Sequence, residues 1–286
     1  MFDVIIIGKG PAGISASIYT KRANLKTLVI AKDGGALEKA DKIENYYGFE
    51  SISGKDLIVA GEKQAEKLGV VIKNEEVLTI RYEEIGFNIV TNKNEYLAKA
   101  VIIATGVNRP KLKLEGIEEF EGKGVSYCAI CDAFFFKDKR VAVLGNGEYA
   151  LHEINELMPI VKDVSLLTNG KEKIELRDDR IKVYDKRIKR LRGNNTLEYV
   201  EFEDESNINV SAVFVADGTA SSVDFARRIG ANIKDNKIIV DDGYMTNVPG
   251  LFAAGDCIGG LLQISKAVSD GAKAGISAIN YIRSKE

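Results

Sequence analysis

The sequence predicts an α/β protein with two Rossmann-like domains, the second inserted in the first. Two observations predict this fold. A pattern of strand, glycine motif, helix and strand begins at residue 2, and a related pattern begins at residue 140. With 286 residues the chain is long enough for two domains that each bury a core.

The first unit is complete from strand to strand. Its four parts are residues 2–7, 8–13, 14–23 and 27–30. The second part reads G-K-G-P-A-G, the G-x-G-x-x-G fingerprint of dinucleotide-binding domains. In such a motif Gly8 permits the tight turn, Gly10 lets the backbone approach a pyrophosphate, and Gly13 brings the helix close to the strand. The amino terminus of the helix then faces the phosphate charge.

The second unit carries the variant G-x-G-x-x-A. Its parts are an apolar run at 140–144, the motif at 145–150, a helix-like stretch to Leu157 and an apolar run at 164–167. As a second copy in one chain, it predicts tandem dinucleotide-binding folds.

Two further strand-like runs belong to the first domain. Residues 101–106 and 250–256 are apolar and end in Thr-Gly and Gly-Asp. Turn-forming stretches at 108–110 and 241–243 are candidate linkers. We therefore place the first domain at residues 1–108 and 243–286 and the inserted domain at 109–242.

Composition and charge exclude several classes of protein. The formal net charge is -2, so the chain lacks the basic field that nucleic acid or an anionic membrane demands. No apolar run reaches about 18 residues, and the amino terminus lacks the features of a secretory signal. One His and three Cys leave too few ligands for a structural zinc site. We expect a cytoplasmic protein with no nucleic-acid partner, no membrane partner and no metal.

The sharpest chemical feature is the run Cys128-Ala129-Ile130-Cys131-Asp132. Two cysteines at this spacing can close a small disulfide ring, and the amino end of a helical turn favours the thiolate of the first. The carboxyl group of Asp132 could move a proton during thiol–disulfide exchange. The alternatives are two buried structural thiols, or a metal site that would need two further soft ligands. We interpret Cys257 as packed and inert.

The order of these motifs resembles that of the low-molecular-weight thioredoxin reductases over essentially the whole chain. The order is GxGxxG, A-T-G at 104–106, CxxCD, GxGxxA and F-A-A-G-D at 252–256. The resemblance implies FAD in the first domain, a redox disulfide in the inserted domain, thioredoxin as partner and a homodimer. It implies that Cys131 faces the flavin, that Cys128 attacks thioredoxin, and that Asp132 is the acid–base group.

The resemblance also implies a set of FAD-binding residues. They are Gly8, Gly10, Pro11, Ala12, Gly13, Lys32, Gly35, Ala36, Asn45, Val77, Ala104, Thr105, Gly106, Gly255, Asp256, Gln263 and Ile264. The acidic residue that would meet the FAD ribose near residues 29–32 is absent. We interpret its absence as a variation in the adenosine contacts.

Departures from the family pattern indicate the electron donor. Members that use NADPH carry several arginines after the second strand of the second unit, whereas Lys171 and Lys173 are the nearby cations here. An acidic residue to take the ribose of NADH is absent too. Tyr149 stands where the family usually has a small Ser, and it could crowd a nucleotide.

These departures resemble the ferredoxin-dependent flavin thioredoxin reductases, so we favour ferredoxin as the donor. One alternative is an NAD(P)H-dependent thioredoxin reductase with an atypical nucleotide site. Another is a flavin and disulfide redox sensor that turns nothing over.

Three further expectations concern the inserted domain. An acidic ferredoxin needs a basic surface, but the densest cationic stretch, residues 186–192, fits a charged strand edge better and we assign no docking site. Phe134–Phe136 could help to bind thioredoxin or bury the Cys loop, but we favour a strand core. We expect His152 on a surface or in helix packing. A swing about linkers near residues 109 and 242 would let the disulfide meet first the flavin and then thioredoxin.

Overall fold

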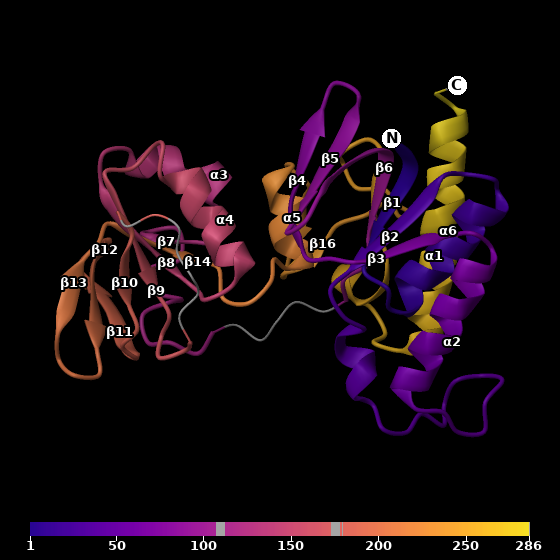
Figure 1. Ribbon diagram of the computed structural model, residues 1–286, viewed down its shortest axis with the longest axis horizontal. Helices are drawn as coiled ribbons and strands as arrows, with labels where there is room; N and C mark the ends of the chain where they lie inside the picture. The colour runs from indigo at the N-terminus through magenta and orange to yellow at the C-terminus, as the bar shows by residue number, and fades with distance from the viewer. Residues whose placement is uncertain (107–111, 173–177, 179, 286) are drawn as a thin grey trace. The chain divides into compact units, whose positions relative to one another are not determined.

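The computed structural model describes residues 1–106, 112–172, 178 and 180–285 (Figure 1). It divides into two compact units. Unit 1 comprises Met1–Arg109 and Ser221–Glu286, and unit 2 comprises Pro110–Ala220. Each unit has its own sheet and its own buried apolar core, as the sequence predicts.

Unit 1 is built on a seven-stranded sheet in the order β3-β2-β1-β6-β5-β4, with β17 beside β6. The strands are β1 (Phe2–Ile7), β2 (Thr27–Ala31), β3 (Val71–Asn74), β4 (Val77–Glu83), β5 (Gly86–Thr91), β6 (Glu95–Ile103) and β17 (Leu251–Ala253). Strands β3, β2, β1, β6 and β17 run parallel, whereas β4 and β5 extend the sheet in antiparallel fashion. Strands β1 and β2 are almost wholly apolar, as strands covered on both faces require.

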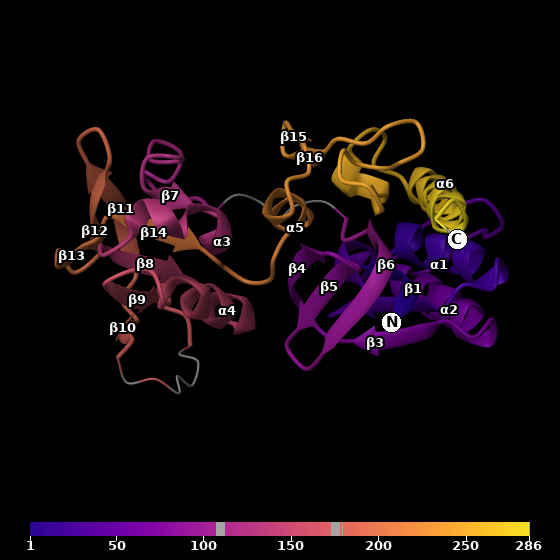
Figure 2. The ribbon, with the colours of Figure 1, turned by 90° about the horizontal axis from the view of Figure 1, so that it is seen from above.

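Helices α1 (Pro11–Arg22) and α6 (Ile264–Arg283) of unit 1 pack closely because small residues face each other between them. The other helices of unit 1 are α2 (Gly54–Lys67) and α5 (Ser222–Arg228), with short 3-10 turns η1 (Gly35–Lys39) and η3 (Gly255–Ile258). Helices α1 and α6 lie side by side (Figure 1, Figure 2). A methyl group at Gly271 would overlap the carbonyl oxygen of Ala12, so this approach requires glycine there.

Unit 2 is built on a five-stranded parallel sheet, β10-β9-β8-β14-β7, and a three-stranded antiparallel sheet, β11-β12-β13. The strands are β7 (Val125–Ser126), β8 (Arg140–Leu144), β9 (Asp163–Leu167), β10 (Lys182–Tyr184), β11 (Ile188–Gly193), β12 (Leu197–Phe202), β13 (Asn207–Asn209) and β14 (Ala212–Val215). Helix α4 (Glu148–Leu157) joins β8 to β9, and the short α3 (Ala129–Asp132) and η2 (Ala133–Phe136) follow β7. One apolar cluster joins the two sheets.

Both predicted strand–helix–strand units are present, as β1-α1-β2 and β8-α4-β9. The point at which the chain returns to unit 1 differs from our expectation. We placed it near residues 241–243, but the compact units divide between Ala220 and Ser221. The reason is that α5 packs against β4, and the hairpin of β15 (Ile233–Lys234) and β16 (Lys237–Ile238) packs against η3. The linker expected at 108–110 lies outside the described residues.

Two searches of the described part of the chain bear on membranes and metals. No helix in it is both long and apolar enough to cross a membrane. No group of three or more His, Cys, Asp or Glu side chains in it is placed to hold a metal ion.

Candidate active site

The Cys128–Cys131 disulfide lies at the start of α3 in unit 2, as predicted. Cys128 is the N-cap residue of this helix, and the Cys131 amide donates a hydrogen bond to its sulfur over 3.2 Å. Cys128 is 1% exposed, whereas Cys131 is exposed. The two sulfurs are therefore unequal, since one is accessible and the other is buried against an amide donor.

Asp132 is tied to the disulfide through Ser126. The Ser126 hydroxyl donates to Asp132 Oδ2 over 2.6 Å and accepts from the Cys128 amide over 3.1 Å. This places a half-buried carboxylate beside the redox pair. It does not by itself test the acid–base role that we expect for Asp132.

Sequence reasoning missed Glu153. Its side chain comes from α4, is 1% exposed, and accepts the Ala129 amide at 2.8 Å through Oε2. Its position in the sequence could have indicated that it is buried. Glu153 lies on the same helix face as Ala150, Ile154 and Leu157, which are buried. A carboxylate at such a position needs a partner inside the protein.

The prediction that Phe134–Phe136 form a strand core is wrong. These residues make the 3-10 turn η2, where Phe134 is 77% exposed and Phe135 is 71% exposed. Only Phe136 packs inward, with its ring edge-on to Phe214 at a centroid distance of 5.8 Å. His152 lies on α4 with 11% of its side chain exposed, 3.8 Å from Glu156, which fits helix packing.

The predicted FAD-binding residues gather at one edge of the unit 1 sheet. Strands β2, β1, β6 and β17 are parallel neighbours, so their carboxyl ends meet there. From these ends come Lys32, the motif of residues 8–13, Ala104–Gly106 and Gly255–Asp256. Gly35 and Ala36 begin η1, Val77 begins β4, and Gln263 and Ile264 start α6. The Asn45 side chain reaches the same place, donating to Gln263 Oε1 over 2.9 Å.

The first glycine motif is closed on one side and open on the other. A methyl group at Gly8 would overlap the Ala104 carbonyl oxygen, and one at Gly13 would overlap that of Gly8. A methyl group at Gly10 would have no described atom within 4 Å, apart from those of its neighbours in the chain. Gly10 also caps α1 with no side-chain hydrogen bond from the described residues, and no acidic residue lies in the first turn. Open amide groups at a helix start form an anion site.

Buried polar atoms at this edge lack protein partners. Thr105 Oγ1 is buried and has no hydrogen-bond partner among the described residues. Burial raises the pKa of the Asp256 carboxyl, while Lys266 opposes the rise and Asp270 adds to it. Asp270 also accepts the Gly255 amide over 3.2 Å. An edge with open amides, an unsatisfied hydroxyl and a carboxylate fits a bound dinucleotide cofactor such as FAD.

The structure supplies an acidic residue near the end of β2 that sequence reasoning did not find. Glu76 precedes β4, and its Oε2 lies 2.6 Å from Lys32 Nζ. Its side chain is 6% exposed, and Oε1 has no hydrogen-bond partner within the described ranges. A carboxylate is therefore present near the end of β2, but it comes from the connection between β3 and β4.

The second glycine motif has charged side chains of the chain itself around it. Helix α4 begins at Glu148, so an acidic side chain lies in its first turn. Lys171, after β9, is ion-paired with Asp217, which follows β14. Lys173 lies outside the described residues. Tyr149 is buried rather than standing over the motif, and its hydroxyl donates to the Tyr127 carbonyl at 3.5 Å.

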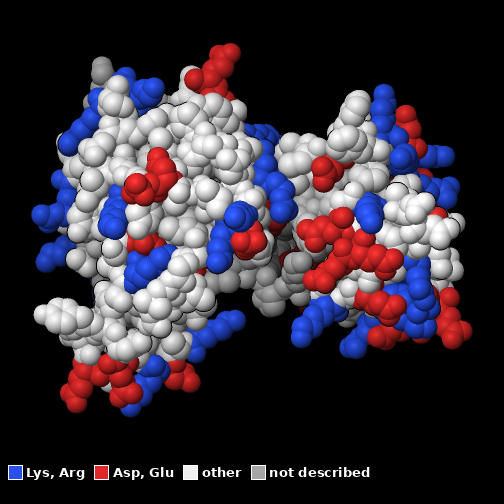
Figure 3. Space-filling view, turned by 180° about the vertical axis from the view of Figure 1, so that it is seen from behind, with Lys and Arg blue, Asp and Glu red and all other residues white. Residues whose placement is uncertain are grey.

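Four of the five cations of the stretch at 186–192 are paired with carboxylates on or just after the neighbouring strand β12. Lys189, Arg190 and Arg192 all lie within 4 Å of Glu201, and Arg190 holds it through a 2.7 Å contact. Lys186 pairs with Asp204 at 2.6 Å. On the face of unit 2 in Figure 3, Lys and Arg side chains stand among Asp and Glu side chains. These pairings favour the strand-edge interpretation of this stretch.

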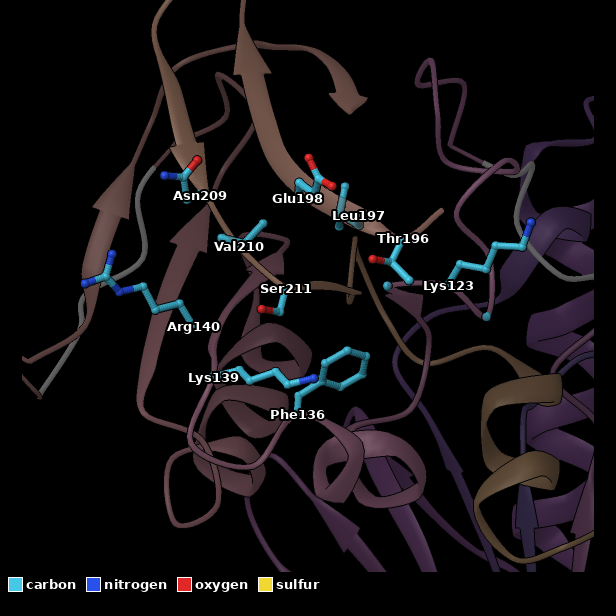
Figure 4. Close-up of a pocket in the computed structure, with 12 residues that line it drawn as sticks. Lys123, Phe136, Lys139, Arg140, Thr196, Leu197, Glu198, Asn209, Val210 and Ser211 are labelled. Carbon is cyan, nitrogen blue, oxygen red and sulfur yellow. The ribbon is translucent and has the colours of Figure 1, made fainter. Parts of the chain in front are cut away.

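A cavity of about 530 Å³ opens at the amino ends of β8, β12 and β14. Figure 4 shows the Lys139 side chain beside the Phe136 ring, and its Nζ lies 5.6 Å from the ring centroid. Arg140 is held by Asp163 at 3.3 Å. The cavity is at the opposite ends of the strands from the second glycine motif, so it is not the nucleotide position of that motif.

The third cysteine is sealed in unit 1. Cys257 in η3 is buried, and its thiol contacts the carbonyl oxygens of Ala254 and Ile103 at 3.3 and 3.5 Å. Burial raises the pKa of this thiol to about 12. Cys257 is therefore a packed, unreactive residue.

Comparisons with known proteins agree with this site. The family model for pyridine nucleotide-disulphide oxidoreductases matches residues 2–271. The chain is 35% identical to the thioredoxin reductase of Buchnera aphidicola, covering 98% of this chain and 97% of that one. The crystal structure of the atypical thioredoxin reductase TRi from Desulfovibrio vulgaris Hildenborough is 41% identical, with a TM-score of 0.95 and coverage of 100% and 99%. A ferredoxin-flavin thioredoxin reductase from Clostridium acetobutylicum is 29% identical, with a TM-score of 0.75 and coverage of 99% and 98%.

Proposed function

This chain belongs to the pyridine nucleotide-disulphide oxidoreductase family, and from that premise we propose that it is an FAD-dependent thioredoxin reductase supplied by ferredoxin. Two reduced ferredoxins and two protons would convert one thioredoxin disulfide to the dithiol. The Cys128–Cys131 disulfide of unit 2 would carry the electron pair to thioredoxin.

FAD is the cofactor of this protein, and when bound it supplies a carrier that takes up electrons singly and releases them as a pair. The open amides at Gly10 and the start of α1 would hold the pyrophosphate. Thr105 Oγ1 and Asp256 would satisfy polar groups of the cofactor near the ends of β6 and β17. The Asn45–Gln263 pair would close the same edge.

The inequality of the two sulfurs supports a division of labour. The exposed Cys131 is the sulfur that the incoming electron pair can reach. Cys128 then leaves as a thiolate, which the Cys131 amide and the amino end of α3 stabilise. Cys128 is 1% exposed in the oxidised protein, so it would have to become accessible once the Cys128–Cys131 bond is broken. Its thiolate would then attack the thioredoxin disulfide, and Cys131 would attack the resulting mixed disulfide, which re-forms the Cys128–Cys131 bond and releases the thioredoxin dithiol. Asp132, held by Ser126, would move the proton.

An exposed apolar rim beside the disulfide supports a protein substrate. Ile130, Phe134 and Phe135 are 43%, 77% and 71% exposed, and all lie within four residues of Cys131. Large apolar side chains in such a group favour contact with a partner protein. We propose this rim as the surface that meets thioredoxin.

The choice of ferredoxin as the electron donor depends on the charged residues around the second glycine motif. Glu148 opposes phosphate at the first turn of α4, and Lys171 is already paired with Asp217. A nicotinamide dinucleotide would find little charge complementarity there, whereas a one-electron protein donor needs no such site. The similarity to a ferredoxin-flavin thioredoxin reductase supports the same choice.

An anaerobic titration of the oxidised protein tests the proposal. Reduced ferredoxin should bleach the flavin absorbance and, with thioredoxin present, yield thioredoxin dithiol. NADPH and NADH should leave the flavin oxidised. The matched control Cys128→Ser should still be bleached by ferredoxin yet release no thioredoxin dithiol. Rapid bleaching by either coenzyme contradicts ferredoxin dependence, and bleaching without thioredoxin reduction in the unmodified protein favours a sensor.

An NAD(P)H-dependent reductase is the second candidate, and one observation favours it. The Gly147 cap of α4 has no side-chain hydrogen bond from the described residues, so the motif retains its open amides. The same titration separates the two donors.

Three further expectations stay predictions. They are the homodimer, the cytoplasmic location and the swing of unit 2 between flavin and thioredoxin. A redox disulfide together with a buried free Cys257 is consistent with a reducing compartment. Light scattering on the purified holoprotein would measure the assembly.

A further inference from the structure

Glu153 places a carboxylate behind the redox disulfide. Its Oε2 accepts the amide of Ala129 over 2.8 Å, and Ala129 is the first residue of α3, directly after Cys128. Both Glu153 and Ala129 are buried, with 1% and 0% of their surfaces exposed. Only one peptide unit separates the hydrogen-bonded amide from the residue that carries the buried sulfur.

Two opposing effects act on the ionised form of Glu153. An amide donor at the amino end of a helix stabilises a carboxylate, although burial opposes it. The other titratable residues of α4 are Glu148, Tyr149, His152 and Glu156. His152 lies 3.8 Å from Glu156, and the Tyr149 hydroxyl contacts the Tyr127 carbonyl. On the facing helix α3 the titratable groups of the reduced protein are Cys131 and Asp132, and Ser126 holds Asp132.

We propose that Glu153 is a positioning residue that tunes the Cys128 thiol by placing a buried negative charge at the amino end of the CxxC helix. This role rests on the thiol–disulfide exchange proposed above. It adds a second carboxylate to the site, acting on Cys128 from α4 while Asp132 acts from α3.

Two opposing influences meet at Cys128. The Cys131 amide and the start of α3 favour the thiolate and lower its pKa. A buried carboxylate close by disfavours a second negative charge and raises that pKa. A thiol attacks a disulfide fastest when its pKa lies near the ambient pH, because a very stable thiolate is a poor nucleophile. Glu153 would therefore keep the Cys128 thiolate available yet reactive.

The pH profile of thiol alkylation measures this balance directly. The reduced holoprotein is treated with iodoacetamide over a range of pH, and mass spectrometry of the peptides separates Cys128 from Cys131. In Glu153→Gln the amide oxygen can still accept the Ala129 hydrogen bond, but the charge is gone. We expect the midpoint for Cys128 to fall by about 1 pH unit, which gives roughly tenfold more thiolate at a pH below both midpoints.

Two further variants separate charge from packing. Glu156→Gln removes a carboxylate from the same helix that is 27% exposed, and its Cys128 midpoint should match that of the unmodified protein. Glu153→Asp keeps the charge but withdraws it by one methylene, so its Cys128 midpoint should fall by less than that of Glu153→Gln. An unchanged midpoint in Glu153→Gln, or an equal shift in Glu156→Gln, overturns the proposal.

The FAD content and circular dichroism of Glu153→Gln would reveal whether this variant folds. If it does not fold, the pH midpoint of Cys128 alkylation can still be measured in a second variant. Glu153→Asp, with the charge withdrawn by one methylene, then carries the test through a smaller downward shift, and no shift overturns the proposal. The assay needs neither thioredoxin nor an electron donor. A failure of the proposed reductase activity therefore leaves this result standing, and the reverse also holds.

Discussion

The two glycine motifs of this chain share a backbone plan but differ in what surrounds it. Each joins a buried strand to a helix, and each helix is capped by the second glycine of its motif without a side-chain hydrogen bond from the described residues. At α1 no acidic side chain lies in the first turn, and unsatisfied polar atoms lie at the same sheet edge. At α4 Glu148 occupies the first turn, and the neighbouring Lys171 is paired with Asp217.

The difference shows that a glycine motif reports helix–strand packing first and ligand binding second. A methyl group at Gly145 would overlap the Ala216 carbonyl oxygen, so this glycine is needed for packing even if no nucleotide binds. The charges at the start of the helix determine whether a phosphate group binds there. The four predictions below test this comparison, beginning with the largest expected effect.

Matched substitutions at the second glycine of each motif should separate the two sites. Gly10→Ala should lower FAD affinity by roughly 100-fold or more, because the methyl group would project into space that only a ligand can fill. Gly147→Ala should leave FAD affinity unchanged, since its methyl group would meet Gly218 at 3.6 Å, an ordinary contact. Flavin retention through dialysis measures both. Equal FAD loss in the two variants would remove the distinction between the motifs.

Opening the second site should create affinity for a coenzyme. Glu148→Gln together with Asp217→Asn removes one charge from the first turn of α4 and releases Lys171. We expect NADPH affinity to rise about tenfold, since each change contributes up to about 1 kcal/mol. Calorimetric titration of the double variant against the unmodified protein measures it. If affinity stays the same, charge is not what excludes the coenzyme.

How far the sequence predicts this molecule depends on the distance between cooperating residues. The strand–helix–strand units and the CxxC disulfide are local patterns, and both are present. Glu153 and Glu76 act on groups 24 and 44 residues away, and no local pattern links them to their partners. The return point at Ser221 was missed because it depends on α5 packing against β4.

Removing the Glu76 carboxylate should weaken FAD binding modestly. Glu76→Gln removes the charge from the 2.6 Å ion pair with Lys32 and replaces one of the two buried carboxylate acceptors with an amide donor. We expect a loss of roughly fivefold in FAD affinity, the scale of one hydrogen bond. Fluorescence titration of apoprotein with FAD would measure it, with Glu50→Gln, an exposed loop position, as control. No loss in Glu76→Gln would show that the adenosine end is read by other groups.

The smallest effect concerns support for the open edge of unit 1. Tyr244 donates to Asp270 over 2.8 Å, and burial together with this bond raises the pKa of Tyr244 from 10.0 to about 12. Because the folded protein holds this proton more tightly than the unfolded chain, the stabilisation is complete below about pH 10 and is lost as the pH rises toward 12. We expect Tyr244→Phe to cost less than about 1 kcal/mol near pH 8 and still less near pH 11. Urea unfolding at both pH values measures the difference, and a constant difference would contradict this account.

The burial of Cys257 has a consequence for how the molecule meets oxidants. A chain with three cysteines could, in principle, exchange disulfide partners and form a pairing that blocks its activity. Because the Cys257 thiol is buried against the Ala254 and Ile103 carbonyls, Cys128 and Cys131 are the cysteines that can form a disulfide with each other. We therefore expect a mild oxidant to re-form the Cys128–Cys131 disulfide, which the proposed reductase cycle would reduce again.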